Sequence, residues 1–285
     1  MDVVKITPSV TAVLRPADGA NVGLIDTGEG LIVIDTAQSA TEAAQVLGTA
    51  GAAPQQAVLL INTHCHSDHT WGNQLFDCPI LAHRLCRQMM TDCLTGRWSA
   101  ESIEQGLAEC DDPAWAARMR QEWSDLQITL PTETFDRQRT VEIGSAVLEL
   151  VHLGGHTPGS SVAWLPESGT LFTGDLIFQH QYPYLQDADV PVWIAALEYM
   201  LTLPAQTIVP GHGTLCDEAR VVELADYLAE TWSRTADHVA RGHDKEETLA
   251  DPDYPRYAED PPGRFEENIR LVYARLKNAT HPEVQ

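Results

Sequence analysis

A run of five apolar residues leads directly into a histidine-rich string at positions 63–69, with the sequence THCHSDH. A run this short and this aliphatic predicts a buried β-strand. Alternate side chains of an extended segment point to one side, so His64 and His66 can face the same point. Asp68 and His69 follow in a turn and can face another. Imidazoles and a carboxylate suit borderline divalent metals. Because the ligands face two different points, we predict two adjacent cations that share this loop. The alternative is a histidine-rich surface turn.

The same arrangement recurs at three later places, where a predicted strand ends and a histidine or an aspartate stands in the turn that follows. These residues are His156 after the run 146–153, Asp175 after 170–173 and His212 after 207–210. In an α/β domain the loops at strand ends converge, and functional sites collect there. We therefore expect all of these side chains to share one site.

The order of the predicted elements favours a mixed α/β domain with two similar halves. Strands are expected at 6–14, 22–25, 31–34, 140–144, 162–165 and 170–173. The two-glycine link at 27–30 and the turn at 166–169 each predict a hairpin. Helices are expected at 39–50, 192–203, 217–241 and 265–276, and a polar and aromatic loop at 176–190.

Residues 84–130 differ in composition from the rest of the chain. Strand signals stop there and Ala, Glu, Gln, Met and Arg dominate, which predicts a helical insertion of two or three helices. It contains three tryptophans that we interpret as packing residues, or as one wall of a pocket: Trp98, Trp115 and Trp123. Residues 216–285 are expected to form a C-terminal helical extension of a single domain over 1–285.

The charge balance restricts the partners of this protein. Lys and Arg total 18 against 41 Asp and Glu, a net charge of -23. Phosphate backbones and anionic membranes repel such a surface, so we expect a small-molecule substrate, no nucleic acid and no membrane. The start of the sequence lacks the pattern of a signal peptide, and no stretch is apolar for long enough to span a bilayer. The six cysteines show no framework spacing and are expected to be reduced thiols of a cytoplasmic protein.

With these motifs the chain resembles the metallo-β-lactamase superfamily of metallohydrolases. The matching strings are HCHSDH at 64–69, GHTPG at 155–159, TGD at 173–175 and PGHG at 210–213, in the family's order. Asp35 matches the family's aspartate after an early strand. The resemblance covers roughly residues 6 to 225 and implies an α/β fold, a four-layer αβ/βα sandwich, with a dinuclear metal centre.

The resemblance also implies a role for each matching residue. One metal would be held by His64, His66 and His156, the other by Asp68, His69 and His212, and Asp175 would bridge them. Zinc (Zn2+), two per chain, is the usual metal, and iron or manganese occurs in some members. We expect Asp35 to hold a ligand histidine or the metal-bearing loop, and not to bind metal itself.

The implied mechanism is hydrolysis. Two cations about 3.5–4 Å apart lower the pKa of a bridging water towards ~7, so hydroxide is available to attack a carbonyl carbon. Asp68 is expected to orient this nucleophile and to carry the proton to the leaving group. Three residues soon after Asp175 are candidates to contact substrate: His180, Tyr182 and Tyr184. Cys65 should point away from its neighbouring ligands, and Cys216 is expected to pack at a helix start.

Three functional hypotheses follow. The first is a dinuclear metal-dependent hydrolase of a small ester, thioester, lactone or β-lactam. The second is a mononuclear iron dioxygenase of persulfides on the same fold, and the third is a metal-binding protein without catalysis. One major group of metallo-β-lactamases has a cysteine where Asp175 stands, which argues against a penicillin-type substrate, and His66 argues against the flavin-linked di-iron reductases.

Overall fold

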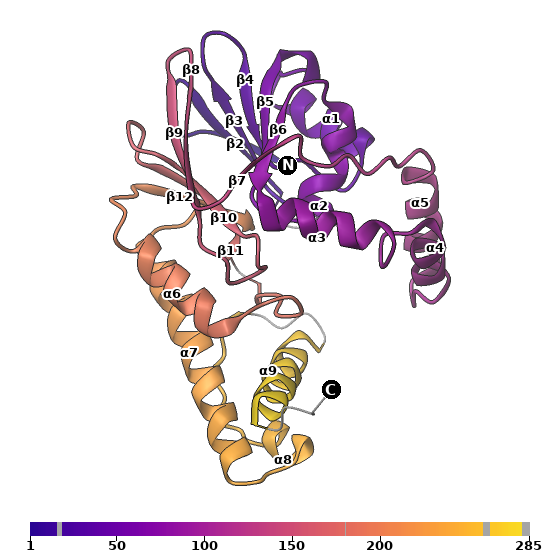
Figure 1. Cartoon of the computed structure of the whole chain (residues 1–285), viewed down its shortest axis with the longest axis vertical. Coiled ribbons are helices and arrows are strands. Elements are labelled where there is room, and N and C mark those ends of the chain that lie inside the picture. Colours follow the sequence, from indigo (N-terminus) through magenta and orange to yellow (C-terminus); the bar gives the residue numbers. More distant parts are fainter. Residues whose placement is uncertain (16–18, 180, 259–262, 281–285) are drawn as a thin grey trace.

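Two β-sheets pack face to face, and helices cover the outer face of each (Figure 1). The computed structural model describes residues 1–15, 19–179, 181–258 and 263–280. Within them, the first sheet consists of β1 (Asp2–Lys5), β2 (Val10–Leu14), β3 (Val22–Asp26), β4 (Leu31–Ile34), β5 (Ala57–Asn62), β6 (Ile80–His83) and β7 (Glu133–Phe135), in that order. The second consists of β8 (Gln138–Ile143), β9 (Ala146–His152), β10 (Ser161–Leu165), β11 (Thr170–Phe178) and β12 (Thr207–His212). Here too, strands that are consecutive in the sequence are neighbours in the sheet.

Strand direction changes once in each sheet. Strands β1 to β4 are antiparallel, whereas β4 to β7 are parallel. In the second sheet β8 to β11 are antiparallel, and β12 joins β11 in parallel. Parallel neighbours bring equivalent strand ends to one edge, and this edge carries the histidines of interest.

The helices lie outside the two sheets or extend beyond them. They are α1 (Ala40–Thr49), α2 (Ser67–Thr70), α3 (Arg84–Leu94), α4 (Ala100–Ala108), α5 (Pro113–Glu122), α6 (Val190–Met200), α7 (Glu218–Ala240), α8 (Lys245–Leu249) and α9 (Arg264–Thr280). Short 3-10 turns lie at η1 (Pro54–Gln56) and η2 (Trp71–Leu75). The α4–α5 pair projects on one side, and α7 to α9 extend away from the sheets (Figure 1). None of the described helices has the length and apolar composition that a membrane crossing requires.

The alternation of side chains along the strands builds the layers. In β4, Ile32 and Ile34 belong to the core between the two sheets, while Val33 packs on the other face with α1. The next strand repeats this pattern, with Leu59 and Ile61 in the central core. Both faces of these strands are buried, which explains why their sequences are continuous aliphatic runs. The outer face of the second sheet packs against α6, α7 and α9.

The four-layer sandwich expected from the sequence is confirmed. Both predicted hairpins are present, since β3 pairs with β4 and β10 with β11 in antiparallel register. Between residues 84 and 130 the structure has three helices, α3, α4 and α5. The long helix expected at 217–241 is α7. A single domain over 1–285 stays a prediction.

The expectation of one strand over 6–14 is wrong. Only residues 10–14 of this region form a strand, β2. Residues 6–9 form a turn, and β2 pairs in antiparallel register with β1, which lies before it at Asp2–Lys5. The turn between them contains Pro8, and Val10 donates its backbone N–H to the hydroxyl of Thr7 at 3.0 Å. A proline and a side chain that satisfies a backbone donor favour a turn over a continuous strand.

The strand that carries Asp175 does not end there, contrary to expectation. Strand β11 runs on to Phe178, so the loop expected at 176–190 begins later, at 179. The pairing of β11 with β12 is irregular on both sides of Gly174, whose φ is +50°. Glycine adopts this left-handed conformation without strain, and the irregularity redirects the next side chain, Asp175.

Neighbouring residues on opposite faces of β9 test the assignment of the central core. Leu148 is fully buried between the sheets, whereas Val147 is 46 % exposed. We expect Leu148→Ala to lower the free energy of unfolding by roughly 2–5 kcal/mol, because it leaves a cavity in a packed core. Val147→Ala, the matched control, should change it by about 0.5 kcal/mol or less. Denaturant unfolding of both variants checks this, and equal losses would contradict the layer assignment.

Candidate metal centre

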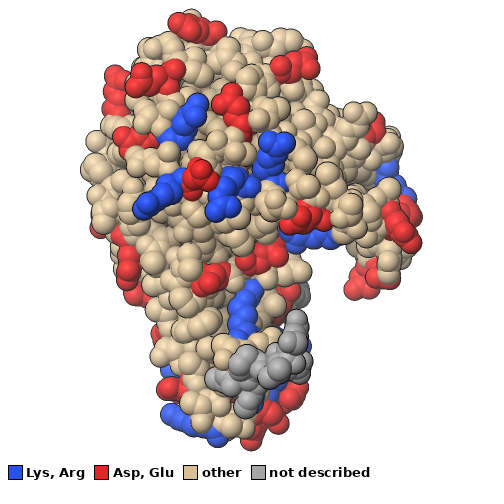
Figure 2. All heavy atoms as spheres, viewed as in Figure 1, with Lys and Arg blue, Asp and Glu red and all other residues tan. Residues whose placement is uncertain are grey.

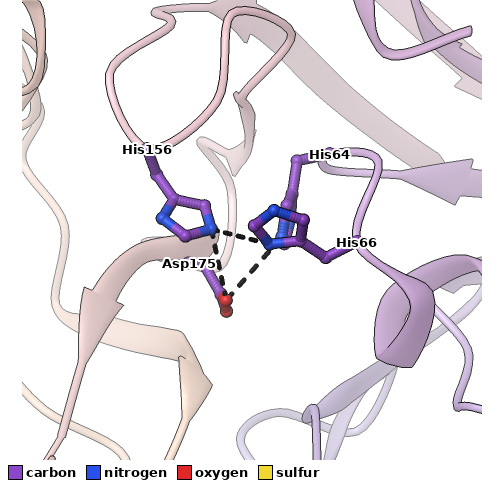
Figure 3. A group of neighbouring side chains, drawn as sticks. All are labelled: His64, His66, His156 and Asp175. Atoms are coloured by element: carbon purple, nitrogen blue, oxygen red, sulfur yellow. Dashed lines mark hydrogen bonds and ion pairs between the residues drawn. The ribbon is translucent and has the colours of Figure 1, made fainter. Parts of the chain in front are cut away.

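The structure brings all seven predicted ligands together, although they come from distant parts of the chain. The loop after β5 and helix α2 carry four of them, and the others lie after β9, within β11 and at the end of β12. Their ligand atoms form two groups, each within 4.8 Å: His64, His66, His156 and Asp175, and then Asp68, His69 and His212. Figure 3 shows the side chains of the first group pointing toward one another.

The carboxylate of Asp175 lies between the two groups. Its Oδ2 is 3.7 Å from Nε2 of His64 and 3.5 Å from Nε2 of His156. Its Oδ1 is 3.1 Å from Nε2 of His69 and 3.2 Å from Nε2 of His212. One oxygen therefore faces each group, as a bridging carboxylate requires.

His156 and His66 each make a contact outside the site through one ring nitrogen, and this contact leaves the other ring nitrogen facing the remaining predicted ligands. Nδ1 of His156 is 3.1 Å from the carbonyl oxygen of Tyr184, which leaves Nε2 facing the site. His66 is turned the other way. Its Nε2 pairs with Oδ2 of Asp187 at 3.0 Å, and its Nδ1 lies 3.0 Å from Nε2 of His156. Arg97 pairs with the same Asp187 oxygen at 3.0 Å. Such outer contacts fix ring orientation and tautomer.

Asp35 supports the loop that carries the predicted ligands His64 and His69. Its carboxylate accepts hydrogen bonds from the backbone N–H and the hydroxyl of Thr63, at 2.7 and 2.6 Å, and pairs with Nδ1 of His69 at 2.8 Å. The Thr63 hydroxyl also lies 3.1 Å from Nδ1 of His64. Asp35, His64 and His69 form a third group of close ligand atoms. Because both carboxylate oxygens of Asp35 already accept hydrogen bonds, its contacts fit the expected positioning role.

Three buried atoms in the centre form no well-directed hydrogen bond among the described residues: Nε2 of His64, and Nε2 of His69 and Oδ1 of Asp175, which lie 3.1 Å apart. An unsatisfied buried polar atom costs about 1–3 kcal/mol, so native structures rarely leave several together. All three belong to residues that face one another across the site. Nitrogen and carboxylate donors in this arrangement fit divalent metals of the zinc type.

The charge states of His64, His156 and Asp175 fit metal binding. Burial lowers the pKa of His64 well below its usual range and that of His156 to about 3, so both rings are neutral. For Asp175, burial acts to raise the pKa, but the neighbouring His212 and His69 outweigh it and hold the pKa well below the usual range. Neutral imidazoles and an ionised carboxylate are the forms that coordinate a metal.

The charge states of His69 and His212 differ from these. At both rings burial is outweighed by Asp175 and Asp68, which raise the pKa of His69 well above its usual range and that of His212 to about 10. These two rings must therefore lose a proton to bind a metal.

The site opens into a cavity of about 410 Å³ that Asp68 and Asp175 help to line. Tyr182 and Tyr184, expected to contact substrate, both line it. The hydroxyl of Tyr182 accepts a hydrogen bond from the backbone of Tyr257 at 3.2 Å, which holds this wall in place. Substrate contact by either tyrosine stays a prediction, and His180 lies outside the described residues.

The sequence revealed neither Asp187 nor Arg97. Both are charged residues in loops with no local motif, and only the fold brings them beside His66. The cysteine expectations agree with the structure. Cys65 is fully buried in a cluster that includes Met90, and Cys216 exchanges backbone hydrogen bonds with β12.

Comparison with known proteins identifies related chains. The family model described as "Metallo-beta-lactamase superfamily" matches residues 15–212. "Acyl-coenzyme A thioesterase MBLAC2" of Homo sapiens is 24% identical over 231 residues, covering 74% of this chain and 79% of that protein.

Two solved structures share the fold. "Metallo-beta-lactamase from Pontibacter korlensis" has a TM-score of 0.60 at 22% identity, covering 80% of this chain and 98% of that one. The stereoselective inverting sec-alkylsulfatase Pisa1 from Pseudomonas sp. has a TM-score of 0.77 at 17% identity and covers 99% of this chain. The present chain spans about half of the sulfatase, 52% of its length.

A glycine beside the centre tests how tightly Asp175 is held. A Cβ atom at Gly211 would lie 1.9 Å from Oδ1 of Asp175 and 2.7 Å from the backbone carbon of Gly174. We expect Gly211→Ala to displace this carboxylate and to lower the amount of metal that co-purifies by about half or more. Gly48→Ala is the matched control, because nothing lies within 4 Å of its added Cβ. Metal analysis of the two variants decides, and equal metal content would contradict the close packing.

Removing Asp187 tests the outer contact to His66. We expect Asp187→Ala to weaken metal affinity roughly 10–100-fold, because the ring of His66 loses the partner that orients it. Competition with a chromogenic chelator measures the affinity. Asp125→Ala removes the same charge from an exposed position and should leave the affinity unchanged. A loss of the same size in both variants would show a general charge effect instead.

Proposed function

Because this chain belongs to the metallo-beta-lactamase superfamily, we propose that it is a dinuclear metal-dependent hydrolase of small esters and thioesters. The observation that carries the proposal is the position of Asp175, whose two carboxylate oxygens each face a separate group of histidines. A mononuclear site does not require a second group of ligand residues on the other side of the same carboxylate.

The proposal assigns seven residues to two metals. His64, His66 and His156 would hold one, Asp68, His69 and His212 the other, with Asp175 shared. Zinc is the proposed metal, two per chain, because imidazole and carboxylate donors suit it. When bound, such a pair supplies Lewis acidity, which activates water near neutral pH and polarises a carbonyl oxygen.

Asp68 is the proposed proton carrier. It lines the cavity, its side chain is 25 % exposed, and its Oδ2 lies 3.2 Å from Nε2 of His212. A carboxylate in this position can hold the attacking water and pass its proton to the leaving atom. The walls around it include Phe178, whose ring is parallel to that of His212, with the ring centres 5.4 Å apart.

Two observations favour an acyl substrate with an anionic group. The relative MBLAC2 is named an acyl-coenzyme A thioesterase. The cavity also presents Arg97 and Arg264, which come from distant segments of a chain with net charge -23. Each already pairs with one carboxylate, Arg97 with Asp187 and Arg264 with Glu267, and a guanidinium group has further N–H donors for a ligand. Guanidinium groups at the mouth of a pocket favour carboxylate or phosphate groups on the ligand.

Metal analysis together with a substrate panel tests the proposal. The purified protein, loaded with zinc, should hold two zinc ions per chain and hydrolyse simple thioesters and chromogenic esters. A chelator should abolish this turnover, and zinc should restore it. The panel also includes a lactone and a cephalosporin. A persulfide is tested as well, and an oxygen electrode measures any oxygen consumption with it.

Two outcomes would overturn the proposal. One iron per chain with oxygen consumption on the persulfide would show an oxygenase. Full zinc loading without turnover of any substrate in the panel would show a metal-binding protein instead.

A further inference from the structure

A second cavity, of about 610 Å³, lies beneath helices α4 and α5, in the segment that projects from the sheets (Figure 1). Aliphatic and aromatic side chains form most of its walls, among them Leu94, Trp98, Ile103, Leu107, Leu126 and Ile128. Two charged residues on its lining, Glu104 and Arg120, pair with each other at 2.8 Å and are largely exposed. The charged groups therefore satisfy one another, and the apolar walls remain for a ligand.

This cavity adjoins the candidate metal centre. Trp98 lines both the apolar cavity and the 410 Å³ cavity that contains Asp68. Its indole is 8 % exposed and packs edge-on against Trp71 at 5.7 Å, directly after the helix that carries Asp68. The neighbouring Arg97 pairs with Asp187 and so joins the same wall to His66. Trp98 is thus a wall common to both cavities.

The size and lining of the apolar cavity suit an organic ligand. Ligand pockets typically enclose about 300–1,000 Å³ and are lined by apolar side chains. Ile103, Leu126 and Ile128 are only half-buried, so an apolar occupant would remove further apolar surface from water. Figure 2 shows acidic and basic side chains at the rim of the projecting segment on the visible face, so the apolar recess lies within a surface that also carries charge.

We propose that the cavity under α4 and α5 binds the acyl chain of the substrate, and that the enzyme prefers medium-chain and longer acyl groups. The inference rests on the proposed ester and thioester hydrolysis for its reaction, but the binding of the chain does not depend on turnover. The reacting carbonyl lies at the metal centre, the anionic leaving group faces Arg97 and Arg264, and the apolar chain passes Trp98.

A chain-length series on the zinc-loaded enzyme tests the proposal. Acetyl, butyryl, hexanoyl, octanoyl and decanoyl thioesters of one thiol should give kcat/KM values that rise roughly fourfold per added methylene until the cavity is filled. Ala100 lines the cavity and is exposed, so Ala100→Phe fills it without removing a core contact. This variant should keep its acetyl activity and lose the rise with chain length.

The matched control is Ala108→Phe, the same change at the other, exposed end of α4. It lies outside the cavity lining and should retain the wild-type series. A second series of acetyl thioesters, in which only the thiol lengthens, separates the two ends of the substrate, and a preference that follows the thiol and not the acyl group would overturn the proposal. So would a wild-type series that is flat from acetyl to decanoyl.

Calorimetry separates this inference from the proposed function. The wild type should bind decanoate at least tenfold more tightly than butyrate, and Ala100→Phe should bind the two alike. This result supports the acyl site even if no thioester is hydrolysed. Equal binding of decanoate and butyrate by the wild type would overturn the acyl site even if thioesters are hydrolysed.

Discussion

The buried carboxylate of Asp175 is the group on which the site depends. It is 4 % exposed and lies 3.1 to 3.7 Å from four imidazoles of three other segments. A buried charge is costly unless it is paired with opposite charge, which His69 and His212 supply here. The histidines therefore have to converge where β11 places this carboxylate. The irregular pairing at Gly174 is what turns the side chain toward them.

The two sheets provide the rigid support that this convergence needs. Both faces of the central strands are buried, so the strand ends have little freedom. Asp35 adds a local constraint, since it adopts a φ of +58° and yet holds Thr63 and His69 through three short contacts. A non-glycine residue in this conformation costs about 1–3 kcal/mol, and such strain concentrates at functional sites. The contacts to the histidine loop offset it.

In the proposed function, reactivity and selectivity come from different parts of the molecule. The proposed metal ligands lie on strand ends and on α2. The proposed substrate-selecting walls come from the α4–α5 segment and from the loop after β11, which carries Tyr184 and Asp187. A relative named as a thioesterase and a solved structure named as a sulfatase show that this fold accommodates different functions.

Local patterns in the sequence identified most of the strands and the seven candidate ligands, and the resemblance to the family implied the four-layer arrangement. Alternating or continuous apolar runs identify strands, and a histidine or aspartate after a run marks its position at the sheet edge. Only the tertiary structure decided that β1 and β2 are separate strands and that β11 continues past Asp175. It also decided which of the two oxygens of Asp175 faces which group, the contact of Asp187 with His66, and the cavity under α4 and α5. The physical reason is that these features join residues far apart in the chain, and nothing in the sequence near either partner specifies such contacts.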